Sequence, residues 1–287
     1  MIEAVGTRPK AWLEHPDGSL WLFKAARSDT NRPGGQDWAE KGAAELGQLL
    51  GIPVAAVELA TRSGAKGIVS RNFVRAETSL VHGNELLSAN DDAYPQEQRQ
   101  NDTAGYTVAA IRDALEPYSA PESATIAAVE SAFDWFSGYL VFDAWINNTD
   151  RHHMNWGILA NQNVLAPSFD HGSSLAFGET ESRRNSMLSG GDTSIRSWLD
   201  NGRTRSFEGM PSMVDVAVSA LDLCTAPTRA SWLERLGNLD SPLVNGVIDQ
   251  LPETGPAGPI LSEAAGIFCK AILRINRERL LDAAATN

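Results

Sequence analysis

Polar side chains that could do chemistry are concentrated in two short stretches, NTDRHHMN at 148–155 and FDHG at 169–172. The first places Asp150 and Asn155 five residues apart, and the second supplies Asp170. Phosphoryl transfer from ATP requires a carboxylate that orients the attacking hydroxyl, together with carboxylate and amide oxygens that bind Mg²⁺. The order DxxxxN and then DxG therefore predicts a phosphotransferase site in which Asn155 and Asp170 are the metal ligands.

Such a site also needs a cation for the nucleotide phosphates and an acid that holds this cation in place. Lys24 lies in the strand-like stretch LWLFKAA on the same side as Leu20 and Leu22, so its stem would cross an inward face while its ammonium reaches a cleft. Glu40 lies on the next predicted helix, beside small residues that would let this helix approach the sheet. We therefore expect Lys24 and Glu40 to form a pair. Gly172 is expected to allow a tight turn after the aspartate of FDHG.

Several elements of the first half must position these residues. KAWLEH, PDGS and LWLFKAA predict two strands joined by a tight Asp-Gly turn, near the start of the chain. GQDWAEKGAAELGQLLG has helical spacing and predicts a helix that ends at Gly51, before Pro53. VAAVELA and GIVSRNFV predict two further strands. Residues 76–121 are polar and contain several prolines, which favours a connection with one short helix.

The second half has a helical pattern. Residues 123–146 predict a helix that is apolar around most of its circumference and therefore belongs in a core, with the 148–155 stretch at its C-terminal end. WGILANQNVLAP predicts a short hairpin that turns at Asn161 and Gln162. The Ser-, Arg- and Gly-rich stretch 179–210 predicts a mobile loop, and the remainder of the chain predicts helices.

This layout predicts an α+β, bilobal, protein-kinase-like fold with a small strand-rich N-lobe and a larger helical C-lobe. The N-lobe would comprise residues 1–80 and hold the nucleotide loop, the lysine strand and the glutamate helix. Residues 81–121 would form a connection or hinge. The helical C-lobe would comprise residues 122–287 and hold the catalytic and metal-binding loops.

The same segments resemble a known family. NTDRHHMN matches the NxDxHxxN loop of HipA-like kinases, and its DRHxxN core also resembles the phosphatidylinositol kinases. GTRPKAWL resembles the GxxPK nucleotide-loop segment of HipA-like proteins, and EKGAAELGQLLGIPVAAVEL resembles their helix and following strand. ILRINRERLL resembles the closing helix of the family. The resemblance spans most of the chain and is strongest in residues 146–172.

The resemblance implies a role for each matching residue. Asp150 would be the catalytic base or the group that orients the hydroxyl, Lys24 would contact the α- and β-phosphates, and Glu40 would brace Lys24. His152 would organise the loop through its ring nitrogens. ATP and Mg²⁺ would be the cofactors, and the residues assigned to the nucleotide would be Gly6, Arg8, Lys10, Lys24 and Phe73.

Composition limits the partners and the compartment. The chain has 24 Lys and Arg against 36 Asp and Glu, a net charge of −12, which disfavours nucleic acid and anionic membranes as direct partners. Two cysteines without ligand spacing imply neither a disulfide framework nor a zinc site. The start of the chain lacks a signal-peptide pattern, and no apolar run is long enough for a membrane helix. We therefore expect a cytoplasmic protein, and its oligomeric state stays open. The kinase-like site and the family resemblance, and not the composition, make a protein the expected substrate.

Other functions remain open at this point. A serine/threonine protein kinase is favoured over a phosphoinositide kinase, because no basic amphipathic segment is present, and a small-molecule acceptor stays possible. The chain could instead be a nucleotide-binding regulatory or toxin-like module that acts through partner binding. A metal-dependent hydrolase using His152, His153, Asp170 and His171 is disfavoured because the HExxH spacing is missing.

The sequence also offers candidate autophosphorylation sites in its Ser-rich stretch. They are Ser182, Ser186, Ser189, Thr193 and Ser194.

Overall fold

The N-terminal part of the chain forms a four-stranded antiparallel sheet. The computed structural model describes residues 10–26, 34–97 and 101–286. The strands β1 (Lys10–Glu14), β2 (Leu20–Ala25), β3 (Val57–Arg62) and β4 (Ala65–Arg71) lie in the order β1-β2-β4-β3. Gly18 turns the first hairpin with a φ of 81°, which confirms the predicted Asp-Gly turn.

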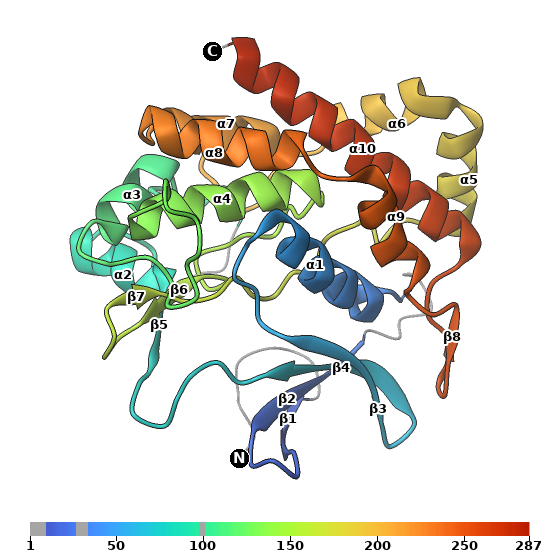
Figure 1. Ribbon diagram of the computed structural model, residues 1–287, viewed down its shortest axis with the longest axis horizontal. Coiled ribbons are helices and arrows are strands. Elements are labelled where there is room, and N and C mark those ends of the chain that lie inside the picture. The colour runs from blue at the N-terminus through green and yellow to red at the C-terminus, as the bar shows by residue number, and fades with distance from the viewer. Residues whose placement is uncertain (1–9, 27–33, 98–100, 287) are drawn as a thin grey trace.

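Helix α1 (Gln36–Leu50) packs against this sheet, as predicted. Ala44 packs with Val57 and Ile68 of the sheet, and a Cβ on Gly47 would lie 2.6 Å from the Val54 side chain. Small residues therefore let the helix approach the following chain closely. The helix ends at Gly51, whose φ of 84° is left-handed. Figure 1 shows α1 between the sheet and the helices of the larger lobe.

The segment between the lobes contains more structure than predicted. One short helix was expected in residues 76–121, and this expectation is wrong, because α2 (Gly83–Asn90) and α3 (Val108–Leu115) are both present. The strand β5 (Leu80–His82) precedes them and pairs with β6 (Gly157–Leu159), which pairs with β7 (Val164–Leu165). The β6–β7 hairpin confirms the predicted turn at Asn161 and Gln162. The exact division into lobes stays a prediction.

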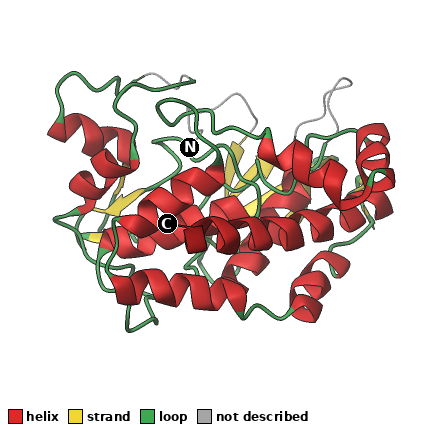
Figure 2. Cartoon of the chain, turned by 90° about the horizontal axis from the view of Figure 1, so that it is seen from above, coloured by secondary structure: helices red, strands yellow, loops and turns green. Residues whose placement is uncertain are grey.

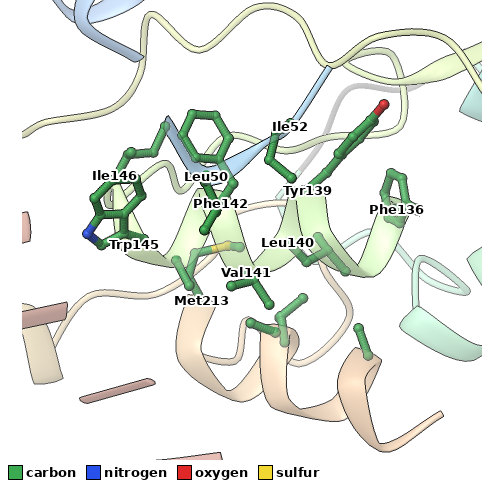
Figure 3. Packing of buried hydrophobic residues seen from close by; sticks show 14 of the residues in the cluster. Leu50, Ile52, Phe136, Tyr139, Leu140, Val141, Phe142, Trp145, Ile146 and Met213 are labelled. Atoms are coloured by element: carbon green, nitrogen blue, oxygen red, sulfur yellow. The ribbon is translucent and has the colours of Figure 1, made fainter. Parts of the chain in front are cut away.

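Helix α4 (Ala132–Trp145) forms the centre of the larger lobe. It begins at residue 132 and not at 123 as expected, because Ser131 and Asp134 form a capping box there. All of its residues except Asp134 are buried, which confirms the predicted core helix. Figure 3 shows its aromatic and aliphatic side chains between α7 (Met213–Asp222) and the chain that follows α1.

The prediction of a mobile loop at residues 179–210 is wrong, because this stretch contains α5 (Glu181–Ser189) and α6 (Gly191–Asp200). Thr180 caps α5 through its side-chain oxygen. The two helices bury a small set of apolar side chains against α10 (Glu263–Thr286). This cluster comprises Met187, Ile195, Leu199, Phe268, Ile272 and Ile275.

The larger lobe is completed by helices α8 (Ala226–Gly237), α9 (Ser241–Asp249) and α10. A small hairpin joins α9 to α10, and its strands β8 (Thr254–Gly255) and β9 (Gly258–Pro259) have two residues each. Figure 2 shows helices making up most of this lobe. The predicted α+β class, with a strand-rich small lobe and a helical large lobe, is confirmed. Within the described residues, no helix has the length and apolar character needed to cross a membrane.

Candidate active site

The loop after α4 is anchored by a buried arginine, Arg151. Asn147, with a φ of 56°, turns the chain out of α4, and the Asn148 side chain then donates a hydrogen bond of 2.7 Å to the Asp143 carboxylate. Arg151 donates through Nε and Nη2 to the two oxygens of the same carboxylate, at 2.6 and 2.8 Å. Its Nη1 donates to the backbone carbonyl of Asn155 at 2.6 Å. The loop that contains Asp150 is therefore fixed to the core helix.

The same guanidinium also holds the FDHG segment. Its Nη1 donates to the carbonyl of Phe169 at 3.2 Å, and its Nη2 donates to the Ser168 hydroxyl at 2.9 Å. Ser168 in turn hydrogen-bonds Nε2 of His171 at 2.7 Å. Burial, and then the charge of Arg151, hold the pKa of His171 well below its usual value, so this imidazole is neutral. One buried cation thus aligns both loops that carry the predicted oxygen ligands.

Arg151 is not among the predicted site residues, although the sequence contains a signal for it. Asp143 is the one acid in the apolar interior of α4, eight residues before this arginine. A carboxylate that is buried on a core helix requires a partner of opposite charge. Both side chains are fully buried. An isolated acid on a core helix, followed by an arginine in the next loop, is a pattern that predicts such an anchor.

Glu40 of α1 binds the backbone of the FDHG turn. Its Oε1 accepts a hydrogen bond of 2.8 Å from the N–H of His171, and it also accepts from the N–H of Gly172. A Cβ on Gly172 would lie 2.9 Å from Glu40 Oε2, so glycine is required there for this close approach. The left-handed backbone of the turn lies at Asp170 (φ 61°), so Gly172 contributes to the turn through its missing side chain.

Lys24 forms an ion pair with Asp170, with 3.6 Å between Nζ and Oδ1. Burial, and then the nearby charge of Asp170, raise the pKa of Glu40 to about 7, while the charge of Lys24 opposes this rise. Lys24 is therefore near enough to Glu40 for their charges to interact. That Glu40 braces Lys24 through a direct contact stays a prediction.

A cleft of about 600 Å³ brings the central predicted residues together. We call it the central cleft. Its walls come from β2, the start of α1, the loop after α4, the FDHG turn and the chain after α6. Four predicted site residues line it: Lys24, Glu40, Asp150 and Asp170. Residues that were not predicted also line it, among them Gln36, Asp37, Ser173, Arg203 and Arg205.

Other predicted residues lie beside the central cleft. Asn155 is buried, and its side-chain amide donates to the carbonyl of Asp150 at 2.8 Å. In the part of the chain that the structure describes, neither Asn155 nor Phe73 belongs to the lining of the cleft. The Phe73 ring lies 5.6 Å from the ring of Phe169, which directly precedes Asp170. The roles of Asn155 on the metal and of Phe73 on the nucleotide stay predictions.

The predicted nucleotide loop is described only at its end. Gly6 and Arg8 lie outside the described residues. Lys10 is paired in register with Lys24 across β1 and β2, so the two side chains share one face of the sheet. This register places a second lysine next to the one that lines the central cleft. A contact between Lys10 and a nucleotide stays a prediction.

The histidines of the site have separate partners. His152 is buried and its Nδ1 accepts from the N–H of Met154 at 3.2 Å, a contact of the kind expected from a loop organiser. His153 bonds the Tyr94 hydroxyl at 2.7 Å through Nδ1. Within residues 10–26, 34–97 and 101–286, no group of three or more His, Cys, Asp or Glu side chains is arranged to hold a metal ion.

Comparisons with known proteins identify a family and a fold. The model of a family described as HipA-like C-terminal domain matches residues 2–228. Among curated proteins, none matches. The proinflammatory kinase CtkA of Helicobacter pylori is similar in structure, with a TM-score of 0.74 and 17% identity over 100% of this chain and 93% of CtkA.

Two further structures share the fold more distantly. HipA of Shewanella oneidensis MR-1, solved with HipB and operator DNA, has a TM-score of 0.54 and 12% identity over 100% of this chain and 67% of that one. A Golgi casein kinase has a TM-score of 0.50 and 15% identity over 100% of this chain and 71% of that one. The predicted kinase-like fold is confirmed by these likenesses.

Proposed function

We propose that this chain, which belongs to the family of proteins with a HipA-like C-terminal domain, is an ATP- and Mg²⁺-dependent kinase that phosphorylates serine or threonine hydroxyls of a protein. The observation that supports this most directly is the central cleft. It brings the Asp150 carboxylate together with the Lys24–Asp170 pair, although these residues come from distant parts of the chain.

The side chains of the central cleft fit the requirements of phosphoryl transfer. Asp150 would accept the proton of the attacking hydroxyl and hold its oxygen in line with the γ-phosphorus. Lys24 would place its ammonium on the phosphates, and Glu40 would keep α1 and the FDHG turn together through the His171 N–H. These residues act by position and charge, which are the main sources of catalysis in this reaction.

The oxygen donors suit a hard divalent cation. Asp170 and Asn155 offer a carboxylate and an amide oxygen, which are preferred ligands of Mg²⁺, and two protein ligands leave room for phosphates. When bound with ATP, Mg²⁺ neutralises charge on the β- and γ-phosphates. Arg151 would act as a positioning residue, because it fixes the backbones of Asn155 and Phe169 at the same time.

A protein is the acceptor that we favour. The exposed arginines Arg203 and Arg205 line the central cleft together with Asp150, so a peptide segment that binds there would meet these cations as well as the carboxylate. The net charge of −12 disfavours binding to nucleic acid or to an anionic membrane. The two cysteines, Cys224 and Cys269, are free, which suits a reducing cytoplasm.

Label transfer from ATP tests this proposal. Purified protein is incubated with γ-labelled ATP, Mg²⁺ and a generic protein acceptor, and wild type is compared with Asp150→Ala and Asp170→Ala. We expect each substitution to lower transfer at least about 100-fold, because each removes a group that acts on the reacting atoms. Asp92→Ala is the matched control, since Asp92 is exposed and lies outside the lining of the central cleft.

The alternatives give different results in the same experiment. Thermal stabilisation by ATP and Mg²⁺ without any transfer would identify a nucleotide-binding regulatory module. Stoichiometric binding of zinc or manganese without nucleotide would favour the hydrolase. Transfer that survives in both variants would contradict the roles given to the two aspartates.

A further inference from the structure

Two arginines in the wall of the central cleft have no acidic partner in the protein. Arg203 and Arg205 are both exposed and line the cleft together with Asp150. Nη1 of Arg203 donates to the backbone carbonyls of Asp200 and Gly202, at 2.8 and 2.9 Å. Among the residues that the structure describes, no carboxylate forms an ion pair with either arginine. Two positive charges therefore stand uncompensated at the site.

The neighbouring arginines of the larger lobe behave differently. Arg196 pairs with Glu278 at 2.7 Å and Arg279 pairs with Asp200 at 2.9 Å, and both pairs join α6 to α10. The chain has 36 Asp and Glu against 24 Lys and Arg, so an arginine has many possible partners within the protein. Two arginines that lie at a cleft without such a partner are available to an acidic group from outside.

The backbone presents both arginines on one side of a fixed segment. Thr204, between them, is buried, and it donates through its N–H and its hydroxyl to the carbonyl of Pro211, at 2.8 and 3.0 Å. The carbonyl of Arg205 accepts a hydrogen bond of 2.7 Å from the N–H of Asp102. Exposure thus alternates from Arg203 to Arg205 because the residue between them is anchored in the core.

The same segment is attached to the loop that contains Asp150. The N–H of Arg205 donates to the carbonyl of Thr149 at 3.4 Å, and Thr149 directly precedes Asp150 and also lines the cleft. An extended peptide advances about 3.3 Å per residue, so a substrate side chain that meets these arginines belongs to a residue about one to three positions from the acceptor. The charged group and the reacting hydroxyl would therefore lie on one short segment of the substrate.

We propose that Arg203 and Arg205 bind an aspartate or glutamate of the substrate close to the phosphorylated serine or threonine, so that this protein selects acidic acceptor segments. The inference rests on the kinase function proposed above. A guanidinium group presents a planar fork of N–H donors that matches the two oxygens of a carboxylate. Hydrogen bonds between such ions are roughly twice as strong as those between neutral groups.

Several acids of the central cleft have partners other than these two arginines. Asp170 pairs with Lys24, and Glu179 pairs with Arg183 at 3.0 Å. Glu40 accepts hydrogen bonds from the backbone of the FDHG turn. The net charge of −12 repels acidic proteins at long range, but salt screens this repulsion beyond about 8 Å at physiological ionic strength. The contact with the two arginines therefore decides which bound segment is preferred.

A set of short peptides tests this inference. Each peptide has one serine, with Asp, Ala or Lys at one of the three positions on either side and small neutral residues elsewhere. The full chain transfers label to these peptides from γ-labelled ATP with Mg²⁺. We expect kcat/KM for the best Asp peptide to exceed that of its Ala counterpart at least about tenfold, which corresponds to about 1.4 kcal/mol for a hydrogen-bonded charge pair. The Lys counterpart is expected to be poorer still.

Charge reversal separates recognition from a structural role. In the double variant Arg203→Glu/Arg205→Glu we expect the preference to reverse, so that the Lys peptide becomes the better acceptor, because a carboxylate now repels the Asp peptide. The KM for ATP is expected to stay within about twofold of wild type. Arg112→Ala is the matched control and is expected to keep the wild-type preference. Arg112 is 44% exposed, pairs with its neighbour Asp113, and is not among the described residues that line the central cleft.

The remaining outcomes separate this inference from the kinase function. Equal kcat/KM for the Asp and Ala peptides at every position would overturn the inference while the kinase function stands, and so would transfer to a generic protein acceptor but to no peptide. A raised KM for ATP in the double variant, with unchanged peptide preference, would assign the arginines to the nucleotide and overturn it too. Absence of transfer to any acceptor would refute the kinase function, and the inference would fail with it.

Discussion

Substitution of Arg151 by alanine is the most direct test of how the candidate site is held together. The guanidinium is fully buried and donates to the Asp143 carboxylate, to the Ser168 hydroxyl and to two backbone carbonyls. Removing it leaves a buried carboxylate without its cation, which costs about 3–5 kcal/mol of the free energy of unfolding. Domains have about 5–15 kcal/mol of stability, so the variant is expected to fold at 25 °C but to unfold at much lower denaturant.

Urea unfolding measures this cost. The free energy of unfolding is extrapolated linearly to water, and an unchanged slope shows that the same surface is exposed on unfolding. Arg75→Ala is the matched control, because Arg75 also pairs with a carboxylate, that of Glu122, but is 71% exposed. Exposed pairs contribute about 0–1 kcal/mol, so the control is expected to unfold close to wild type.

A double-mutant cycle with Asp143→Ala isolates the interaction. Once the carboxylate is gone, the loss of Arg151 no longer leaves it unpaired, so the double variant is expected to cost about 1–3 kcal/mol less than the sum of the single variants. Strict additivity would refute the argument that the buried charge is the main cause. A cost below about 1 kcal/mol for Arg151→Ala alone would refute it too.

Three further predictions concern other parts of the molecule. Burial raises the pKa of Glu40 from 4.5 to about 7, so its contribution to the free energy of unfolding is largest below pH 4.5 and falls by up to about 3 kcal/mol as pH rises through 7. The free energy of unfolding of the wild type is expected to be affected in this way between pH 5 and pH 8, and Glu40→Gln is expected to lose this pH dependence. Gly172→Ala places a Cβ 2.9 Å from Glu40 Oε2, so it is expected to lower the free energy of unfolding by about 1–3 kcal/mol and to weaken ATP binding measured by calorimetry. Gly178 lines the same cleft but has open space around it, so Gly178→Ala is expected to change neither quantity. Ile195→Ala is expected to lower the free energy of unfolding in urea by about 2–5 kcal/mol, because Ile195 is buried against α10. Ser197 is exposed on the same helix, so Ser197→Ala is expected to stay within about 0.5 kcal/mol of the wild type. Equally small effects of both substitutions would mean that α6 is not packed against α10.

The elements that the sequence predicts well are those with a strong local signal. The first hairpin has alternating residues around Asp17 and Gly18, and α1 has helical spacing up to Gly51. The burial of α4 was also predictable, because nearly every position is apolar. In each case the interactions that decide the structure lie within a few residues of one another, so a short window of sequence contains them.

The elements that were not predicted depend on distant contacts. In residues 179–210 few positions are apolar, and Ser, Arg and Gly residues dominate the composition, which favours a loop. Ile195, Trp198 and Leu199 do have helical spacing, but they span little more than one turn. Met187, Ile195 and Leu199 bury their side chains in a cluster with Phe268, Ile272 and Ile275 of α10, which lies far away in the sequence. Short helices such as α2 and α3 likewise gain their stability from packing on the core and not from propensity.

For the site, as for the fold, the sequence predicts which residue types are present better than it predicts which of these residues contact one another. The order of Lys24, Glu40, Asp150 and Asp170 predicts the chemistry, because few reactions need these groups together. The contacts among these groups were not predictable from the sequence. Lys24 forms an ion pair with Asp170, and Glu40 accepts hydrogen bonds from backbone N–H groups of the FDHG turn, where Gly172 leaves room for its carboxylate.

One consequence concerns the two loops that carry the oxygen donors. Arg151 binds the carbonyls of Asn155 and Phe169 through a single nitrogen, Nη1, and its other nitrogens are fixed to α4. The two loops therefore cannot shift relative to each other without breaking a hydrogen bond inside the core, where an unsatisfied carbonyl is costly. A magnesium ion that needs ligands from both loops would then meet them in a fixed geometry, and the energy of binding would not be spent on ordering them. The arginine between Asp150 and His152 is, by this reasoning, as necessary to the predicted metal site as the ligands themselves.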